Sequence, residues 1–111
     1  MDKRITINDI IKELSEKMSD NPDELSKYLV IITANLLKYG QDRIDKDVLQ
    51  SKKWVEIRLD CETDGQADKR IKAADEWRNW QMSIVMEKNL LEMIRSIKSR
   101  LKSLTNELRS Y

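Results

Sequence analysis

A row of basic side chains runs along one face of the C-terminal stretch. Arg95, Lys102 and Arg109 are spaced seven residues apart, and Lys98 lies between the first two. Residues three, four or seven apart share a face of a helix, so the four cations form one stripe. Such a stripe can bind an anionic polymer, because each Lys or Arg that neutralises a phosphate of a nucleic acid releases a counterion. Serines at positions 96, 103 and 110 form a polar line beside it.

The stripe has a second interpretation as an ion-pairing face. An antiparallel helix can pair it with Glu13, Glu16 or Asp20. The overall net charge of +1 hides this contrast, since residues 93–111 carry a net charge of +4 and residues 1–30 carry −2. Contact with DNA and pairing with an acidic helix both stay open on the sequence alone.

A second basic group lies where two long helices are expected to meet, and consists of Lys52, Lys53, Arg58, Lys69, Arg70 and Lys72. Phosphate contact is one interpretation. The other is a solvated helix end, whose cations favour the negative pole of the helix dipole. Trp54, beside Lys53, is a candidate for stacking on a base, since such stacking tolerates any sequence. Trp77 and Trp80 are three residues apart and are expected to pack in a core or an interface.

The residue types that most enzyme chemistry needs are missing. The chain has no His and a single cysteine, Cys61, which excludes Ser–His and Cys–His nucleophile pairs and the usual zinc ligand sets. Gly40 and Gly65 are isolated, so there is no glycine-rich phosphate loop. The acidic run at 60–64 lacks the further ligands of a calcium loop. We expect no enzymatic activity, no metal and no cofactor.

The composition favours a small all-α protein. The 111 residues suffice for one domain, 37% of them are charged and 5% are aromatic, and only two Gly and one Pro are present. Few Gly and Pro argue against a turn-rich β fold, and a thin core suits long helices that share a seam. No signal peptide and no run of about 18 apolar residues is present. We therefore expect a soluble, cytoplasmic protein with no membrane contact.

Apolar spacing and turn signals predict a long helical hairpin with a short N-terminal helix. Asn21-Pro22 is a strong helix start, Gly40 favours a kink, and Thr63–Gln66 is the strongest turn signal. The expected helices, in one domain of residues 1–111, span about 7–18, 22–61 and 67–111. In the first long helix the seam follows Leu25, Leu29, Ile32, Leu36 and Tyr39, and resumes in a shifted phase at Ile44, Val48, Val55 and Leu59.

The last helix carries an uninterrupted apolar heptad seam, formed by Leu90, Ile94, Ile97, Leu101, Leu104 and Leu108. Alternating gaps of four and three keep one stripe of a helix facing a partner helix. Two helices do not cover both long seams well. We therefore expect this seam to form an oligomer interface, in a bundle or a ring of hairpins.

Three stretches of this chain form a colinear set, residues 52–60 (KKWVEIRLD), 71–76 (IKAADE) and 92–100 (EMIRSIKSR). They resemble three segments of the UvsY family, the recombination mediators of T-even-type phages. These segments are the basic end of the long central helix, the motif that opens the C-terminal arm, and an Ile-x-x-Ile-x-x-Arg run. The resemblance covers roughly residues 20–111, and the chain departs from it at Glu56, where the family has a second basic residue.

The resemblance implies a function that is not enzymatic. Members of the family bind single-stranded DNA, assemble as rings, contact the phage single-strand-binding protein and load a RecA-like recombinase onto covered strands. The resemblance therefore implies these partners, and the cytoplasm of a phage-infected bacterium, for this chain. A coiled-coil scaffold or inhibitor that acts only through protein contacts is the alternative. The candidate DNA contacts are Lys52, Lys53, Trp54, Arg58, Lys69, Arg70, Lys72, Arg95, Lys98 and Lys102.

Overall fold

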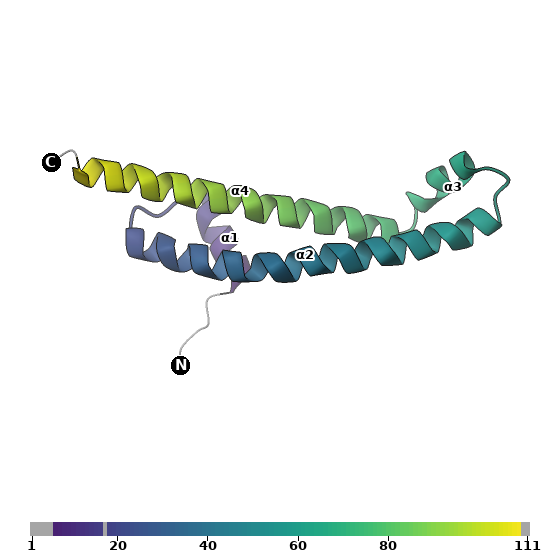
Figure 1. Ribbon diagram of the computed structural model, residues 1–111, viewed down its shortest axis with the longest axis horizontal. Coiled ribbons are helices and arrows are strands. Elements are labelled where there is room, and N and C mark those ends of the chain that lie inside the picture. The colour runs from purple at the N-terminus through teal and green to yellow at the C-terminus, as the bar shows by residue number, and fades with distance from the viewer. Residues whose placement is uncertain (1–5, 17, 110–111) are drawn as a thin grey trace. The chain divides into compact units, whose positions relative to one another are not determined.

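The computed structural model describes residues 6–16 and 18–109, apart from the side chains of Ser15, Leu108 and Arg109. Over these residues it contains no strand and four helices: α1 (Ile7–Glu16), α2 (Pro22–Leu59), α3 (Asp64–Ile71) and α4 (Asp75–Arg109) (Figure 1). The all-α class predicted from the sequence is confirmed. The expected interface contact of Leu108 and the expected stripe position of the Arg109 side chain fall outside the described side chains, and Ser110 falls outside the described residues.

The helices form two compact units, and each unit takes part of α2 and part of α4. The first unit comprises residues up to Leu36 together with those from Leu90 onward, and the second comprises Leu37–Asn89. Each unit has its own buried side chains. The two units share the continuous helices α2 and α4.

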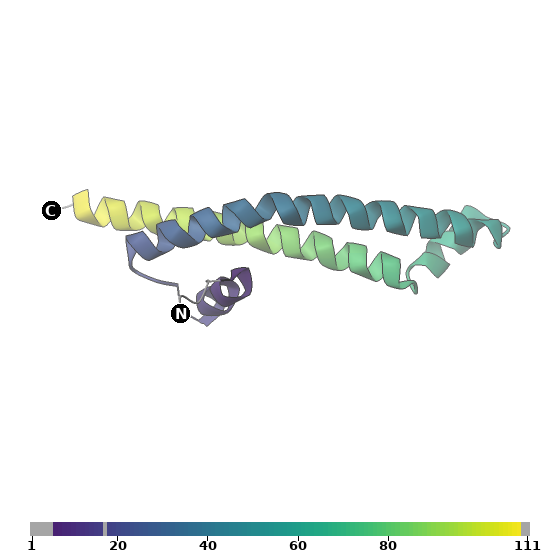
Figure 2. The same cartoon turned by 90° about the horizontal axis from the view of Figure 1, so that it is seen from below.

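The first unit packs α1 against an antiparallel pair, the beginning of α2 and the end of α4, which lie side by side in Figures 1 and 2. The pairing brings apolar positions spaced by three and four residues onto one face of each helix. The buried apolar side chains described there are Ile10, Leu25, Tyr28, Ile32, Leu90, Ile94 and Ile97.

The chain itself covers part of the C-terminal seam. Leu90 and Ile97 have no exposed surface and Ile94 is 8% exposed, whereas Leu101 and Leu104 are half-buried. The first three seam residues, expected at an interface between subunits, therefore lie in the core of a single chain. Any association between copies has to use surfaces that remain exposed.

Tyr28 occupies a core position that the sequence pattern assigned to its neighbour Leu29, which is half-buried. The Tyr28 hydroxyl is hydrogen-bonded to the carboxylate of Glu13 in α1 and, at 2.7 Å, to that of Glu24 in α2. A buried tyrosine is stable when its hydroxyl finds partners. The hydrogen bond to Glu13 is the main cause, and burial the second, of a Tyr28 pKa that lies far above its usual range. The reason is that ionisation would place a phenolate beside two carboxylates.

The folded protein is expected to lose stability as the pH rises above about 10, the ordinary pKa of tyrosine. Above this pH the unfolded chain ionises Tyr28, whereas the folded chain holds it neutral. Its contribution is therefore complete below pH 10 and declines above it. Tyr28→Phe should flatten this decline, measured as urea midpoints between about pH 9 and 11. Tyr39→Phe, which removes a hydroxyl outside this cluster, is the matched control, and equal declines in all three proteins would contradict the prediction.

α2 begins where the sequence predicts. The side-chain oxygen of Asn21 accepts a hydrogen bond from the Asp23 N–H at 3.0 Å, and its carbonyl accepts one from the Leu25 N–H at 3.0 Å. Pro22 takes the first helical position, where its missing N–H leaves no partner unsatisfied. The cap thus fixes the start of the long helix, and α2 ends at Leu59, two residues before the expected end.

The second unit contains the later part of α2, α3 and the beginning of α4. Ala67 and Ile71 of α3 are buried, and Arg43 of α2 forms an ion pair with Glu87 of α4. α2 continues through Gly40 without a break. A Cβ at Gly40 would lie 3.9 Å from the Glu87 carboxylate, which is an ordinary contact, so packing does not demand a glycine there.

The sequence Thr63–Gln66 starts a helix and is not the predicted turn. The Thr63 hydroxyl accepts a hydrogen bond from the Gln66 N–H at 3.3 Å, and the Gln66 side chain accepts one from the Glu62 N–H at 3.0 Å. This reciprocal arrangement resembles a capping box. Gly65 has no positive φ and lies within the first turn of α3. The polar residues that suggested a turn therefore cap a helix.

The single helix expected over 67–111 is two helices in the structure. α3 ends at Ile71, and the Ala73 and Ala74 amides donate to the carbonyls of Arg70 and Ile71 at 3.1 and 2.9 Å. These bonds span three residues rather than four, so they close a tight turn. Asp75 then opens α4 with a carboxylate in its first turn, where the helix dipole favours negative charge.

Candidate nucleic-acid interface

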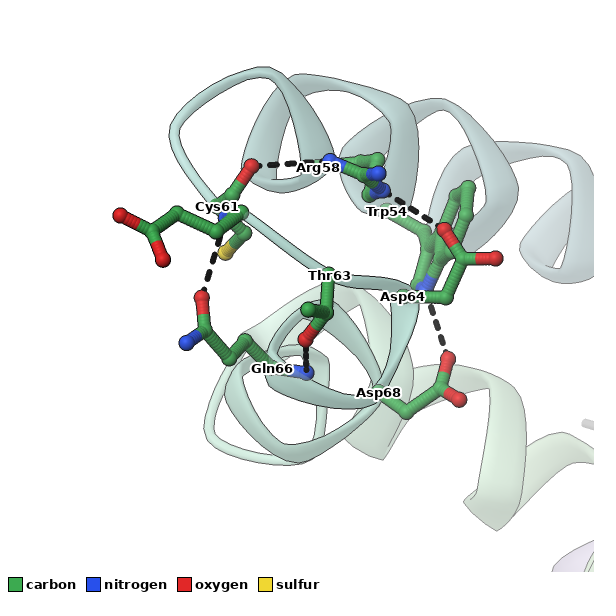
Figure 3. Close-up of polar contacts among 8 residues, drawn as sticks. Trp54, Arg58, Cys61, Thr63, Asp64, Gln66 and Asp68 are labelled. Carbon is green, nitrogen blue, oxygen red and sulfur yellow. Dashed lines mark hydrogen bonds and ion pairs between the residues drawn. The ribbon is translucent and has the colours of Figure 1, made fainter.

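Arg58, a candidate phosphate contact, is held at the end of α2 by partners in its own unit. Its Nε donates to a carboxylate oxygen of Asp64 at 2.6 Å, and one terminal nitrogen donates to the Cys61 carbonyl at 2.8 Å (Figure 3). The first bond joins α2 to the first turn of α3. The second satisfies a backbone carbonyl in the connection. Arg58 therefore closes the link between the two helices, and its charge faces a carboxylate.

Trp54 also joins α2 to α3. Its indole N–H donates to Asp68 at 2.8 Å, and its side chain is half-buried (Figure 3). The neighbouring Lys53 lies 3.3 Å from the Glu56 carboxylate. Lys53 was expected to supply a cation to DNA, and Trp54 a stacking ring. Both side chains are engaged in contacts within the chain.

The other cations of this region are exposed but lie among acids. Lys69 and Arg70 occupy the last turn of α3 and Lys72 is its C-cap, where their charges favour the helix dipole. In the described part of the chain, neither these three nor Lys52 forms an ion pair. The acids interleaved with them in sequence, which weaken the positive field, are Asp60, Glu62, Asp64 and Asp68.

Arg95, Lys98 and Lys102 form an exposed cationic surface on α4, which we call the α4 face. All three side chains are exposed, and none makes an ion pair with another described residue. Their spacing places them on one line over about 10 Å of helix. Ile94 and Ile97 are buried on another side of the same helix, so the core of the first unit fixes the direction of the cations.

An open groove runs beside the α4 face and is lined by Met18, Arg95, Ser96, Ser99, Arg100 and Ser103. The serines form a line with Arg95 on one side and Arg100 on the other. Arg100 forms an ion pair with Asp20, and the Ser96 hydroxyl donates to the Glu92 carbonyl at 3.0 Å. Guanidinium groups and hydroxyls are the donors that proteins use for phosphate oxygens. Because Arg100 and Ser96 are engaged in these contacts, the hydroxyls of Ser99 and Ser103 are the donors that the groove adds to the α4 face.

Among the described side chains, Arg95, Lys98 and Lys102 form no ion pair with Glu13, Glu16 or Asp20. Asp20 pairs with Arg100, which lies outside the stripe, and Glu13 bonds to Tyr28. Sequence reasoning missed Arg100 because the seven-residue repeat selects other positions. Its signal was the line of serines, which has an arginine on each side at 95 and 100.

Residues 6–16 and 18–109 bear on metal binding and on membrane crossing. No group of three or more Cys, Asp or Glu side chains there is placed to hold a metal ion, and no described helix is long and apolar enough to cross a membrane. No protein-family model, curated protein or solved structure matches the chain.

Proposed function

We propose that this protein binds single-stranded DNA through the α4 face and acts as a recombination mediator of the UvsY type. The observation that carries the DNA-binding part of the proposal is the set of three exposed cations, Arg95, Lys98 and Lys102, with no ion-pair partner in the described structure. Serine hydroxyls in the adjoining groove add neutral donors for the phosphate backbone of the DNA strand. Contacts of this kind read phosphates and carry no sequence preference. The mediator role rests on the resemblance of residues 52–60, 71–76 and 92–100 to segments of the UvsY family.

The proposed mechanism is strand organisation without catalysis. One α4 face offers few phosphate contacts, so a single copy binds weakly. Several copies in a homo-oligomer, such as a ring, hold one strand at many points and raise the overall affinity through effective concentration. Protein contacts then exchange the single-strand-binding protein for a RecA-like recombinase on the organised strand. The region around α3 is a weaker candidate surface, because Arg58 and Lys53 are paired with acids.

The alternative is a helical scaffold or inhibitor that acts through protein contacts alone. A row of exposed apolar side chains on α2 supports it, since Ile44, Val48 and Val55 are each about half exposed. An exposed apolar row on a soluble helix commonly marks a surface for another protein. Affinity for DNA separates this alternative from the proposed function.

The test is fluorescence anisotropy of a labelled oligo-dT, with the molar mass measured by light scattering on the same sample. Three phosphate contacts on a single strand predict a log–log salt slope of about −2, which is roughly a 20-fold loss of affinity between about 50 and 200 mM salt. More contacts in an oligomer make the slope steeper. An oligomer that does not bind oligo-dT at low salt would rule out DNA binding and favour the scaffold.

Recombinase loading requires its own measurement. The single-strand-dependent ATPase of a T-even-type phage recombinase, on DNA covered by the matching single-strand-binding protein, should start after a shorter lag when this protein is added. A protein that binds oligo-dT but leaves the lag unchanged would keep the DNA-binding assignment and remove the mediator role.

A further inference from the structure

Four apolar side chains form an exposed strip on the part of α2 that belongs to the second unit. Ile44 and Val48 are each 48% exposed, Val55 is 55% exposed and Leu59 is 82% exposed. Their spacings of four, seven and four residues keep them within about 60° of one another around the helix. We call these four residues the α2 strip. Ile44, Val48 and Val55, with Asp47, Ser51 and Lys52, line an open groove along it.

The order of residues along the strip is symmetric. Its midpoint lies between Ser51 and Lys52, with Val48 and Val55 equally distant on either side, and Ile44 and Leu59 equally distant beyond them. When two such helices pair antiparallel about a two-fold axis at the midpoint, Val48 of one copy meets Val55 of the other. Ile44 of one copy likewise meets Leu59 of the other. A self-complementary surface of this kind is what a two-fold symmetric dimer requires.

The charges on one flank of the strip fit the same arrangement. In an antiparallel pair each flank faces the same flank of the other copy. Asp47 and Arg58 lie on one flank, and the register places Asp47 within two residues of Arg58 in the other copy, twice per dimer. There Asp47 adds a second carboxylate beside a guanidinium that already meets Asp64 of its own chain. On the other flank the two Lys52 side chains approach each other near the axis, and this contact between like charges weakens the pair.

We propose that the α2 strip binds a second copy of this chain in an antiparallel, two-fold symmetric helix pair. The contact covers about 24 Å of helix, which places it at the small end of protein interfaces, so the association depends on concentration. The surface differs from the C-terminal seam, whose first residues the chain buries itself. The inference concerns self-association only, so it stands or falls independently of DNA binding.

The first test is sedimentation of the full chain without DNA, at concentrations from about 1 μM to 1 mM. The wild type should dimerise, and Val48→Glu combined with Val55→Glu should weaken association at least about tenfold. Leu49→Glu is the matched control, because Leu49 is 50% exposed on the same helix but lies off the strip. Circular dichroism checks that each variant keeps its helices. A wild type that stays monomeric, or a double variant that associates as well as the control, would overturn the proposal.

Lys52→Gln and disulfide trapping test the symmetry itself. Removing the two like charges at the axis with Lys52→Gln should tighten the dimer. In a Cys61→Ser background, Ser51→Cys should crosslink to itself, whereas Ile44→Cys should crosslink only when mixed with Leu59→Cys. Self-crosslinking by Ile44→Cys as efficient as that by Ser51→Cys would indicate a parallel pair and would overturn the antiparallel assignment.

Discussion

Replacing Ile97 with Ala is expected to lower the free energy of unfolding by about 2–5 kcal/mol. Ile97 has no exposed surface and lies in the core of the first unit, on the part of α4 that runs beside α2. Removing three carbons there loses apolar burial and leaves a cavity that the surrounding helices fill only in part. Urea unfolding followed by circular dichroism should show a lower midpoint with an unchanged slope.

Leu91→Ala is the matched control on the same helix, because Leu91 is 37% exposed. Its loss should stay below about 1 kcal/mol, as for substitutions away from a core. The difference between Ile97→Ala and the wild type should be the same at every protein concentration, since the chain itself buries Ile97. If the difference grows with concentration, the seam is covered by a second subunit, because binding stabilises the folded state by mass action.

The spacing of apolar residues predicted the helical class and much of the first core. Leu25, Ile32, Leu90, Ile94 and Ile97 are buried as their seams require. The start of α2 was also predicted correctly, because the Asn21 cap is a contact between residues close in sequence. Features that depend on neighbours in the sequence are thus well specified by it.

Contacts between distant residues account for what the sequence did not reveal. Tyr28 is buried because Glu13, fifteen residues away, meets its hydroxyl. Arg100 meets Asp20, eighty residues away, and this partner neutralises one cation of α4. The break between α3 and α4 was hidden for another reason. Neither Gly nor Pro marks it, and it is closed by backbone bonds to Ala73 and Ala74.

The sequence predicted which cations belong to the candidate site, but it did not predict which of them are free of ion pairs. The sequence placed cations on α4 and around α3 with similar weight. In the structure Arg58 is held by Asp64 and Trp54 by Asp68, whereas Arg95, Lys98 and Lys102 are exposed without an ion pair in the part of the chain that is described. A one-dimensional charge pattern does not show which cations are already neutralised.

Reversing the charges of the α4 face is expected to abolish most of the affinity for single-stranded DNA. The variant carries Arg95→Glu, Lys98→Glu and Lys102→Glu. Loss of three phosphate contacts should reduce the log–log salt slope by about 2 and the affinity at about 50 mM salt by roughly 100-fold or more. These side chains are exposed, so the core of the first unit should keep its stability, checked by urea unfolding. Anisotropy of a labelled oligo-dT over a salt series measures both quantities.

The matched control reverses Lys69, Arg70 and Lys72, which changes the net charge by the same amount at another exposed site. It should keep most of the affinity and most of the salt slope, because acids already weaken the field around α3. Equal losses in both variants would mean that net charge alone attracts the strand and that no local face exists. A larger loss in the control would mean that the DNA strand binds around α3. The cations of α4 would then be a solvated surface without a role in DNA binding.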